Sequence, residues 1–453
     1  MFFRSAAAAL QKTGAETPAC NQQQEQQQQH IIILGGGIAG LSTARYLLGN
    51  TQHSRNIKVT VIDRNIDVSL AGASPPISYE QQQTDYLHYS IPSRRNGNVL
   101  CPSLTIPWTT RSLWKEAFLP GIKSLFSSPG NGDSRPSITF EWQSLVTDKA
   151  MYSFGTHFLL QKYIYGRPEH QSNKSILDYN MKCLDDPSDK LIQSIQYGRF
   201  AEGTRLLDGS IKDEDSSGDI GLFCRGLLHQ LTIHYEDRFK IASGESVHSF
   251  LLTSDKDAID GVVTVDKNGI KSSKRADKFV IAMGVESTAL CDTIKVPCPV
   301  YPVKGHLATI SSSVDCKYNI TLPNGIGYAA PMDYLDSNGR RLYRLSGFVD
   351  FTPQKEPDRD RINALINAAK IQLNNDVELI DASACHRPFS ADDRPIVGPV
   401  LKFSNLYLCT GFGSRGWSVG LGSGSLLASM ILGLPYSIDP EQYLPKRFGK
   451  RYY

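Results

Sequence analysis

One stretch near the N-terminus restricts the fold more than any other part of the chain. An apolar run, His30–Leu34, leads directly into Gly35-Gly36-Gly37-Ile38-Ala39-Gly40. The run predicts a buried parallel strand, and small and apolar residues at helical spacing from Leu41 to Leu48 predict a helix after the turn. A second apolar run, Lys58–Ile62, ends in Asp63. Strand, glycine turn, helix, strand and acid are the parts of a dinucleotide-binding βαβ unit.

The glycines of this unit each have a separate physical purpose. Gly35, Gly37 and Gly40 fulfil the pattern GxGxxG. The first permits the tight turn, the second lets the backbone approach a pyrophosphate, and the third lets the helix pack close to the strand. Ile38 and Ala39 open the helix, whose N-terminus attracts phosphate charge. A glycine-rich turn without a ligand is the alternative, and the surrounding strand–helix–strand order argues against it.

The acid at the end of the second strand restricts the ligand further. Asp63 is placed to bind a ribose hydroxyl. Arg64 follows it, and a basic residue there can accept a 2′-phosphate. The motif by itself therefore leaves NAD and FAD both open.

Composition excludes several other classes of protein. The chain has 453 residues, 40% of them hydrophobic and 21% charged, with a net charge of +3, which indicates a globular protein without a bias towards nucleic acid. Nine cysteines lie apart, without metal-ligand spacing, so we expect free thiols and no metal site. No apolar run is long enough for a transmembrane helix. Met1–Cys20 reads either as a weak mitochondrial presequence or as a disordered tail, so a mitochondrial and a cytoplasmic location both stay open.

Further motifs are spread along the chain in a fixed order. They lie at Asn96–Ser103, Ser217–Asp219, 300–305, 387–398 and 411–418. These segments resemble motifs of the D-amino-acid oxidase superfamily of flavoproteins, in particular of its D-amino-acid dehydrogenase branch. The chain departs from that branch at Phe412, where histidine is usual, and at Arg415, where leucine is usual. The departures leave the identity of the substrate open.

The resemblance implies an α/β fold: a Rossmann-type FAD-binding domain with an interleaved α+β substrate domain on a mixed, largely antiparallel sheet. The expected segments are 1–29 as a disordered tail or targeting segment, 30–110, 201–298 and 381–453 as FAD-binding domain, and 111–200 and 299–380 as substrate or cap domain. The segment Ser69–Pro92 has no counterpart in the family and is interpreted as a surface insertion.

The resemblance also implies residue roles. Arg387 is expected over the flavin, where its guanidinium receives a substrate carboxylate; a structural arginine paired with Asp392 or Asp393 is the alternative. Tyr328 and His306 are candidate catalytic residues on the substrate side. The expected FAD-binding residues are Gly35, Gly37, Ile38, Ala39, Gly40, Asp63, Arg64, Asn96, Gly97, Asn98, Val247, Gly284, Arg387, Gly411, Gly413, Ser414, Gly416 and Trp417.

The implied activity is oxidation of the CH–NH bond of an amino acid or related amine. Hydride passes from the α-carbon to noncovalently bound FAD, and the imine is hydrolysed to a 2-oxo acid and ammonia. Cys385 and His386 lie near the position where some sarcosine-oxidase relatives attach flavin covalently, but noncovalent binding is expected here. The electron acceptor stays open between oxygen, a quinone and an electron-transfer protein. Alternatives are oxidation of an N-methyl amine or a 2-hydroxy acid, or a catalytically silent flavoprotein that acts in assembly or binding.

Overall fold

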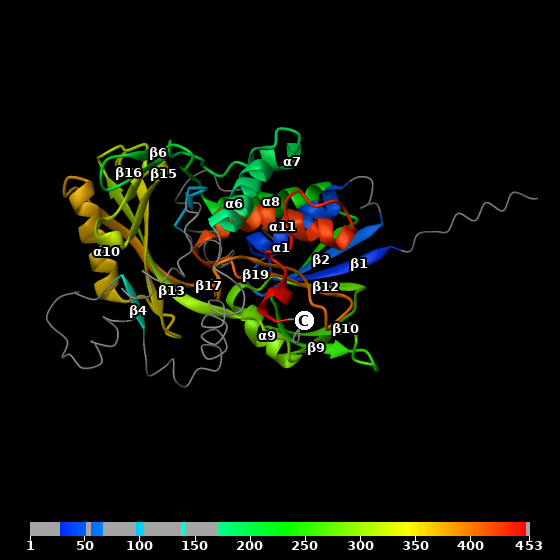
Figure 1. Cartoon of the computed structure of the whole chain (residues 1–453). Helices are drawn as coiled ribbons and strands as arrows, with labels where there is room; N and C mark the ends of the chain where they lie inside the picture. Colours follow the sequence, from blue (N-terminus) through cyan, green and yellow to red (C-terminus); the bar gives the residue numbers. More distant parts are fainter. Residues whose placement is uncertain (1–27, 51–55, 67–96, 104–136, 141–169, 450–453) are drawn as a thin grey trace, which may run out of the picture.

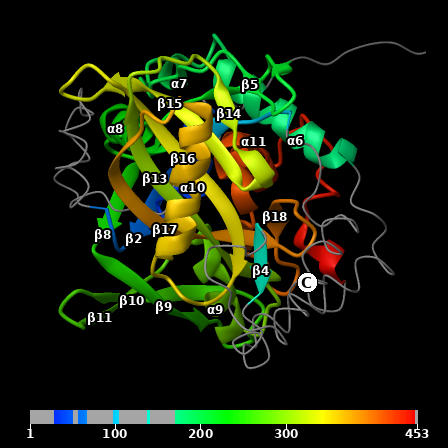
Figure 2. The same cartoon turned by 90° about the vertical axis from the view of Figure 1, so that its left-hand side faces the viewer.

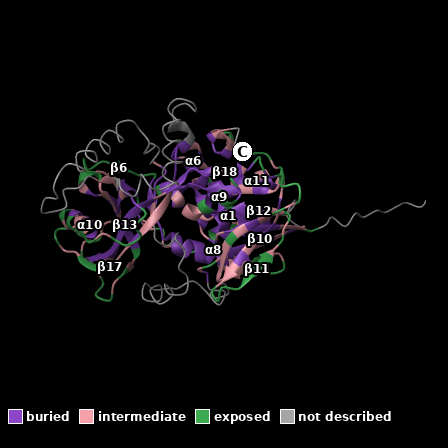
Figure 3. Ribbon diagram, turned by 90° about the horizontal axis from the view of Figure 1, so that it is seen from below, coloured by how far each residue is buried: buried purple, intermediate pink, exposed green. Residues whose placement is uncertain are grey.

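The computed structural model describes residues 28–50, 56–66, 97–103, 137–140 and 170–449. They form two lobes, each built around its own sheet (Figure 1). Buried residues fill the inside of both lobes (Figure 3).

The first lobe contains a six-stranded sheet in the order β18-β19-β12-β1-β2-β8. Its strands are β1 (Gln29–Leu34), β2 (Ile57–Asp63), β8 (Phe239–Ser243), β12 (Lys278–Ile281), β18 (Ile396–Pro399) and β19 (Leu406–Thr410). All pairs are parallel except that of β18 with β19. In the central strand β1, Ile31–Leu34 are fully buried, as expected for a parallel strand covered on both faces.

Helices cover one face of this sheet, and a small second sheet with a short helix covers the other (Figure 1). The first layer contains α1 (Ile38–Gly49), α6 (His170–Asp185), α7 (Lys190–Gln193), α8 (Ile220–His234) and α11 (Gly416–Leu432). The second contains β9 (Glu245–Leu252), β10 (Ile259–Asp266), β11 (Lys271–Lys274) and α9 (Ser287–Thr293). Helices α1 and α11 lie in close contact because a Cβ at Gly424 would be only 2.6 Å from the Ser42 Cβ.

The second lobe contains a mixed, mostly antiparallel sheet in the order β17-β13-β16-β15-β14-β5-β6, with β4 beside β16. Its strands are β4 (Ile138–Phe140), β5 (Thr204–Arg205), β6 (Ile211–Lys212), β13 (Val300–Ser312), β14 (Asn319–Thr321), β15 (Gly327–Leu335), β16 (Arg341–Phe351) and β17 (Glu378–Ser390). Helix α10 (Arg359–Gln372) lies across one face (Figure 2). The remaining elements are β3 (Val99–Leu100), β7 (Ser216–Ser217), η4 (Gly284–Glu286), η5 (Pro323–Gly325), η6 (Gly413–Arg415) and η7 (Pro445–Phe448).

The strand register shows which side chains of the second sheet face α10. Ala308, Leu345 and Ala329 are register partners on β13, β16 and β15, and all three belong to the apolar core under α10. Successive side chains of a strand point to opposite faces. Ser346 and its register partner Tyr328 therefore lie on the other face, which looks towards the first lobe.

The expected fold class is confirmed: two interleaved α/β parts, one with a Rossmann-type parallel sheet and one with a mixed, largely antiparallel sheet. The boundaries of the six expected segments stay predictions. The expected insertion, Ser69–Pro92, lies outside the described residues.

Candidate cofactor and substrate site

A cavity of about 220 Å³ lies where the two lobes meet. Strands β1, β2, β12 and β19 all direct their carboxyl ends to it, through Gly35, Asp63, Ala282 and Thr410. Residues of β17, Cys385–Pro388, line the same cavity from the second lobe. The carboxyl edge of a parallel sheet is the usual ligand site of such folds.

The glycine turn at this edge has no room for side chains. Gly35 has φ +106°, and a Cβ there would lie 2.4 Å from the carbonyl oxygen of Ala282. At Gly40 a Cβ would lie 1.9 Å from the Gly35 carbonyl oxygen. Gly35 lines the cavity together with Gly37, Ile38 and Ala39, whereas Gly40 acts behind the turn. A pyrophosphate can therefore approach the backbone and the N-terminus of α1 closely.

The carboxylate of Asp63 is bonded to the backbone of this turn. It accepts hydrogen bonds from the N–H groups of Gly36 (2.7 Å) and Asn65 (2.8 Å). Burial raises the pKa of Asp63, while these two bonds and Arg64 oppose the increase. The Arg64 guanidinium forms an ion pair with Glu286, and both side chains are partly exposed and line the cavity. The sequence left open that Arg64 binds a 2′-phosphate. In the structure its guanidinium is paired with the Glu286 carboxylate instead.

Residues of β9 and η4 form the adjoining wall of the cavity. Val247 and Gly284, both expected to bind FAD, line it. Gly284 has φ +55°, and its carbonyl oxygen accepts a hydrogen bond of 3.0 Å from the Thr410 hydroxyl. The sequence did not single out the other lining residues of these segments, although each is adjacent or nearly adjacent to an expected one: Glu245, Ser246, Met283, Val285 and Glu286.

The glycine-rich turn before α11 completes the cavity. Gly411 (φ +76°), Gly413 (φ +56°) and Gly416 line it as expected, and so does Phe412. Ser414, by contrast, is exposed to solvent and is not among the lining residues.

Trp417 is also absent from the lining and lies instead in the core of the first lobe. It is buried, its indole N–H donates a 3.0 Å hydrogen bond to the Gly218 carbonyl oxygen, and its ring packs against Tyr197 and Phe223. A direct flavin contact for Trp417 stays a prediction that these contacts do not support.

Arg387 reaches the cavity from β17. Its guanidinium donates hydrogen bonds to the carbonyl oxygens of Phe348 (2.6 Å) and Gly347 (3.4 Å) on β16. It lies directly against Gly305, where a Cβ would be 2.2 Å from the guanidinium carbon. Burial lowers the pKa of Arg387, and the charge of Asp350 opposes this effect.

The two carboxylates considered as structural partners of Arg387 are paired with other arginines. Asp392 lies 2.8 Å from Arg394 and 2.7 Å from Arg447. Asp393 lies 2.8 Å from Arg415. The side chain of Arg415 is buried, so this departure from the family motif forms an internal ion pair rather than a solvent-facing charge. Two of the five N–H donors of Arg387 are bonded to backbone carbonyls, an arrangement that suits an arginine with an anionic ligand.

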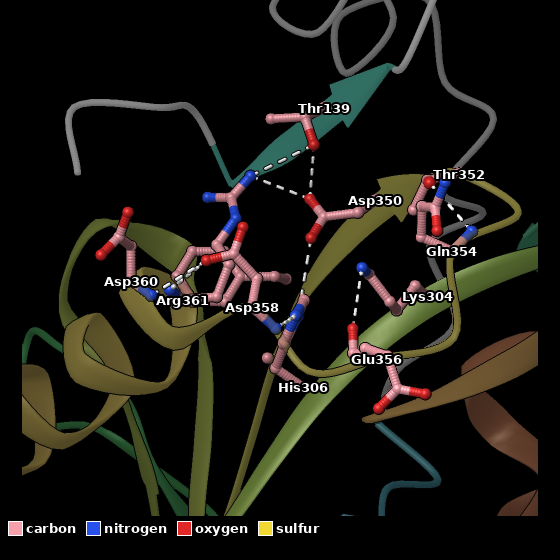
Figure 4. A network of polar contacts seen from close by, with 12 residues as sticks. Thr139, Lys304, His306, Asp350, Thr352, Gln354, Glu356, Asp358, Asp360 and Arg361 are labelled. Atoms are coloured by element: carbon pink, nitrogen blue, oxygen red, sulfur yellow. Dashed lines mark hydrogen bonds and ion pairs between the residues drawn. The ribbon is translucent and has the colours of Figure 1, made fainter. Parts of the chain in front are cut away.

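The remaining expected residues do not line the cavity. Tyr328 lies on the sheet face that looks towards the first lobe, where burial, followed by the charges of Cys101 and Asp215, raises its pKa to about 12. His306 lies on the opposite face, under α10, within a cluster of charged residues (Figure 4). Its placement does not support contact with a substrate, and its catalytic role stays a prediction.

The expected segment under the flavin is described only in part. A Cβ at Gly97 would lie 2.3 Å from the Ser346 hydroxyl, which places Gly97 against the second sheet. Asn98 is buried with φ +60°, and its carbonyl oxygen accepts a hydrogen bond of 2.9 Å from the Gly218 N–H. Neither residue lines the cavity. Asn96 lies outside the described residues.

The residues present fit FAD. One continuous cavity is lined by the first glycine turn at Gly35, by Asp63 and by the second glycine turn at Gly411–Gly413. At Gly35 a Cβ would fill the space that the turn leaves open. A long dinucleotide needs one turn that binds its phosphates and a second, separate turn that contacts its reactive ring. In the described part of the chain, no helix is long and apolar enough to cross a membrane. Within the same residues, no group of three or more His, Cys, Asp or Glu side chains is placed to hold a metal ion.

Comparison with known proteins agrees with this fit. The model of the DAO family, described as FAD dependent oxidoreductase, matches residues 213–430. The D-amino acid dehydrogenase of Granulibacter bethesdensis is 29% identical over 237 residues, which are 52% of this chain and 53% of that protein. The enzyme of the same name from Vibrio vulnificus is 28% identical over 242 residues, 52% of this chain and 54% of that protein. The chain thus spans about half the length of the curated relatives that it matches.

A solved structure extends the likeness in fold. The L-amino acid deaminase from Proteus vulgaris has a TM-score of 0.54 to this chain, covering 97% of it and 100% of the deaminase, at 14% sequence identity. The glycine turns and the shared cavity agree with the family match, which identifies residues 213–430 as similar to the FAD dependent oxidoreductases of the DAO family.

Proposed function

We propose that the chain binds FAD noncovalently in the cavity and oxidises an amine or amino acid whose carboxylate is held by Arg387. One observation carries the proposal. Arg387 lines the same cavity as the dinucleotide turn, and both nearby aspartates, Asp392 and Asp393, are paired with other arginines. The names of the relatives, D-amino acid dehydrogenase and L-amino acid deaminase, support an amino acid as the substrate class.

The protein's own contribution is to position the substrate and exclude water. The Arg387 guanidinium is fixed by the carbonyl oxygens of Phe348 and Gly347, so it can bind a carboxylate in one orientation. Burial lowers the pKa of Arg387 at this end of the cavity, and the same effect on a bound amine would favour its neutral, reactive form. FAD, when bound, supplies a two-electron acceptor.

The reaction balances with FAD as the two-electron acceptor, one water molecule and a final electron acceptor. The α-carbon gives up its hydrogen with two electrons as a hydride, and the amine nitrogen loses a proton. The resulting imine then takes up water and is converted to a 2-oxo acid and ammonia. The final electron acceptor would be oxygen, a quinone or an electron-transfer protein.

The test uses the purified protein with FAD under anaerobic conditions. Candidate donors are added one at a time, and the flavin absorbance is followed. They are D-amino acids, L-amino acids, N-methyl amino acids, 2-hydroxy acids and amines without a carboxylate. We expect amino acids to bleach the flavin and Arg387→Met to slow this bleaching about 100-fold or more through loss of the carboxylate contact. Arg199→Met, which changes a partly exposed arginine paired with Asp185, is the matched control.

Three results would contradict the proposal. Failure to bind FAD would remove the cofactor assignment. Binding of FAD without bleaching by any donor would favour a flavoprotein that acts only in assembly or binding. Bleaching by 2-hydroxy acids but not by amines would replace the substrate class.

A further inference from the structure

A cluster of charged and polar side chains lies on the α10 side of the second sheet (Figure 4), and the strand register places Arg387 on the opposite face. Arg361, which is fully buried, extends from α10 and forms an ion pair of 2.8 Å with Asp350 on β16. The hydroxyl of Thr139 on β4 lies 3.2 Å from Arg361 and donates a hydrogen bond of 2.5 Å to Asp350. The cluster thus joins α10, β16 and β4.

His306 connects this cluster to the start of α10. Its Nε2 accepts a hydrogen bond of 3.1 Å from the backbone N–H of Asp358, the N-cap residue of the helix. An Nε2 that accepts a hydrogen bond carries no proton, so the ring proton is on Nδ1, which faces the Asp350 carboxylate at 3.5 Å. The neutral histidine is thus bonded to the start of α10 through Nε2, and its Nδ1 lies near Asp350 without a hydrogen bond.

The backbone that binds Arg387 lies directly beside this cluster and has an unusual conformation. Phe348 has φ +60°, which is uncommon for an aromatic residue. The strand pairing of β13 with β16 also shifts register here, between Lys304 and His306. At the neighbouring Gly347 a Cβ would lie 2.1 Å from the Ile326 carbonyl oxygen. A positive φ at a residue such as Phe348 persists only where the surrounding structure enforces it, and it is typical of functional sites.

Phe348 connects the two faces of the sheet. Its ring packs under the Arg361 guanidinium, whose carbon lies 4.2 Å from the ring centroid, and edge-to-face with the His306 ring. Its carbonyl oxygen accepts the 2.6 Å hydrogen bond from Arg387. Movement of the ring therefore moves the group that orients Arg387.

We propose that Arg361 and Asp350 are positioning residues: through the ring and backbone of Phe348 they fix the direction in which Arg387 meets a carboxylate ligand. The inference rests on the proposed function, because it takes Arg387 as the carboxylate-binding residue. It adds a pair of residues on the other side of the sheet from Arg387, neither of which lines the cavity. Asp350 also contributes through charge, since it favours the charged form of Arg387.

The test measures binding of a simple carboxylate, benzoate, to the FAD-loaded protein by the change in flavin absorbance. We expect Arg361→Met to weaken benzoate binding about 10- to 100-fold, by analogy with the loss of residues that orient metal ligands, with FAD content unchanged. Arg361→Lys keeps the charge but loses the planar contact with the ring, so an intermediate loss is expected. With a substrate, the apparent KM should increase more than kcat decreases, because the carboxylate contact is present before and during reaction.

Arg341→Met is the matched control. Arg341 lies on the same strand, β16, pairs with Asp315 at 2.8 Å and stacks on the Phe200 ring at 4.3 Å. Its loss removes the same kinds of contact far from Phe348, so benzoate binding should stay within twofold of the unmodified protein.

Arg361→Met leaves the Asp350 carboxylate buried without its arginine, and this variant can fail to fold. Phe348→Leu then replaces it, because it removes the aromatic contact and keeps the ion pair; about tenfold weaker benzoate binding is expected. The inference is overturned if benzoate binding is unchanged in Arg361→Met or, where that variant does not fold, in Phe348→Leu. If Arg387→Met also leaves benzoate binding unchanged, the proposed function itself is wrong. If only Arg387→Met weakens it, the positioning device alone is rejected.

Discussion

The Arg415 guanidinium lies 2.8 Å from the Asp393 carboxylate, and both side chains are buried between the N-cap of α11 and the turn that joins β17 to β18. Breaking a buried pair from one side leaves an uncompensated charge, so we expect Arg415→Met to lower the free energy of unfolding by about 3 to 5 kcal/mol. Urea unfolding measures this.

The partly exposed pair of Arg199 with Asp185 is the control, and Arg199→Met should cost less than about 1 kcal/mol. Adding Asp393→Asn to Arg415→Met should recover part of the loss, because asparagine tolerates the φ of +57° at this position and carries no charge. Equal stability of Arg415→Met and the unmodified protein would show that the pair is not maintained in solution.

Gly40→Ala should prevent FAD binding. The added methyl group would lie 1.9 Å from the Gly35 carbonyl oxygen, so the helix must move away from the phosphate turn. Gly49→Ala on the same helix is the control, because its methyl group meets only the end of the Arg45 side chain. FAD content after purification and after titration with FAD gives the result. A Gly40→Ala protein with normal FAD content would mean that the turn does not hold the cofactor.

Trp417→Phe should destabilise the fold without changing FAD content. The substitution removes the indole N–H bond to the buried Gly218 carbonyl oxygen, at a cost of about 1 to 3 kcal/mol. Thermal or urea unfolding measures the stability, and the flavin absorbance per protein measures the cofactor. A selective loss of FAD from a stable variant would instead support the direct flavin contact expected from the sequence.

His306 should make the protein less stable as the pH falls. Burial, followed by the charges of Lys304 and Arg361, lowers the pKa of His306 to about 3. Below its ordinary pKa of 6.5 the unfolded chain binds a proton that the folded chain does not bind, so the free energy of unfolding falls between pH 6.5 and 3. This group alone contributes up to about 1.4 kcal/mol per pH unit.

His306→Gln keeps an acceptor for the Asp358 N–H and removes the titration. The variant should therefore lose less stability than the unmodified protein between pH 6.5 and 4.5 in urea unfolding. Burial also lowers the pKa of His30 and of His386, so the difference between the two proteins, rather than the slope of either, isolates His306. The exposed His234→Gln is the control. Parallel pH profiles for His306→Gln and the unmodified protein would contradict the prediction.

The first βαβ unit could be predicted closely because its signals are local. The expected strand His30–Leu34 and helix after Gly40 correspond to β1 and α1, and the expected acid ends β2. Hydrophobic spacing and glycine steric limits act over a few residues, so the sequence shows them directly.

Residues whose surroundings come from distant segments were harder to place. Trp417 follows a flavin-type glycine turn, but its neighbours Tyr197 and Phe223 come from segments about 200 residues earlier. The partner of Arg415 likewise depends on the turn at Asp393. The side chains of His306 and Arg387 lie on opposite faces of the sheet. Strand alternation predicts this only when the register of β13 with β17 is known.

The central position of β1 has a consequence for folding during synthesis, because its two neighbouring strands are made at different times. Ile31 of this strand pairs with Val59 on one side and with Lys278 on the other. At a translation rate of about 5 to 20 residues per second, the second partner emerges roughly 10 to 50 s after the first strand. During this interval an apolar, β-rich segment has one open edge, which is the feature that chaperones bind and that aggregation uses. The cavity is completed later still, because Thr410 and Gly411, which line it, lie further along the chain than Lys278.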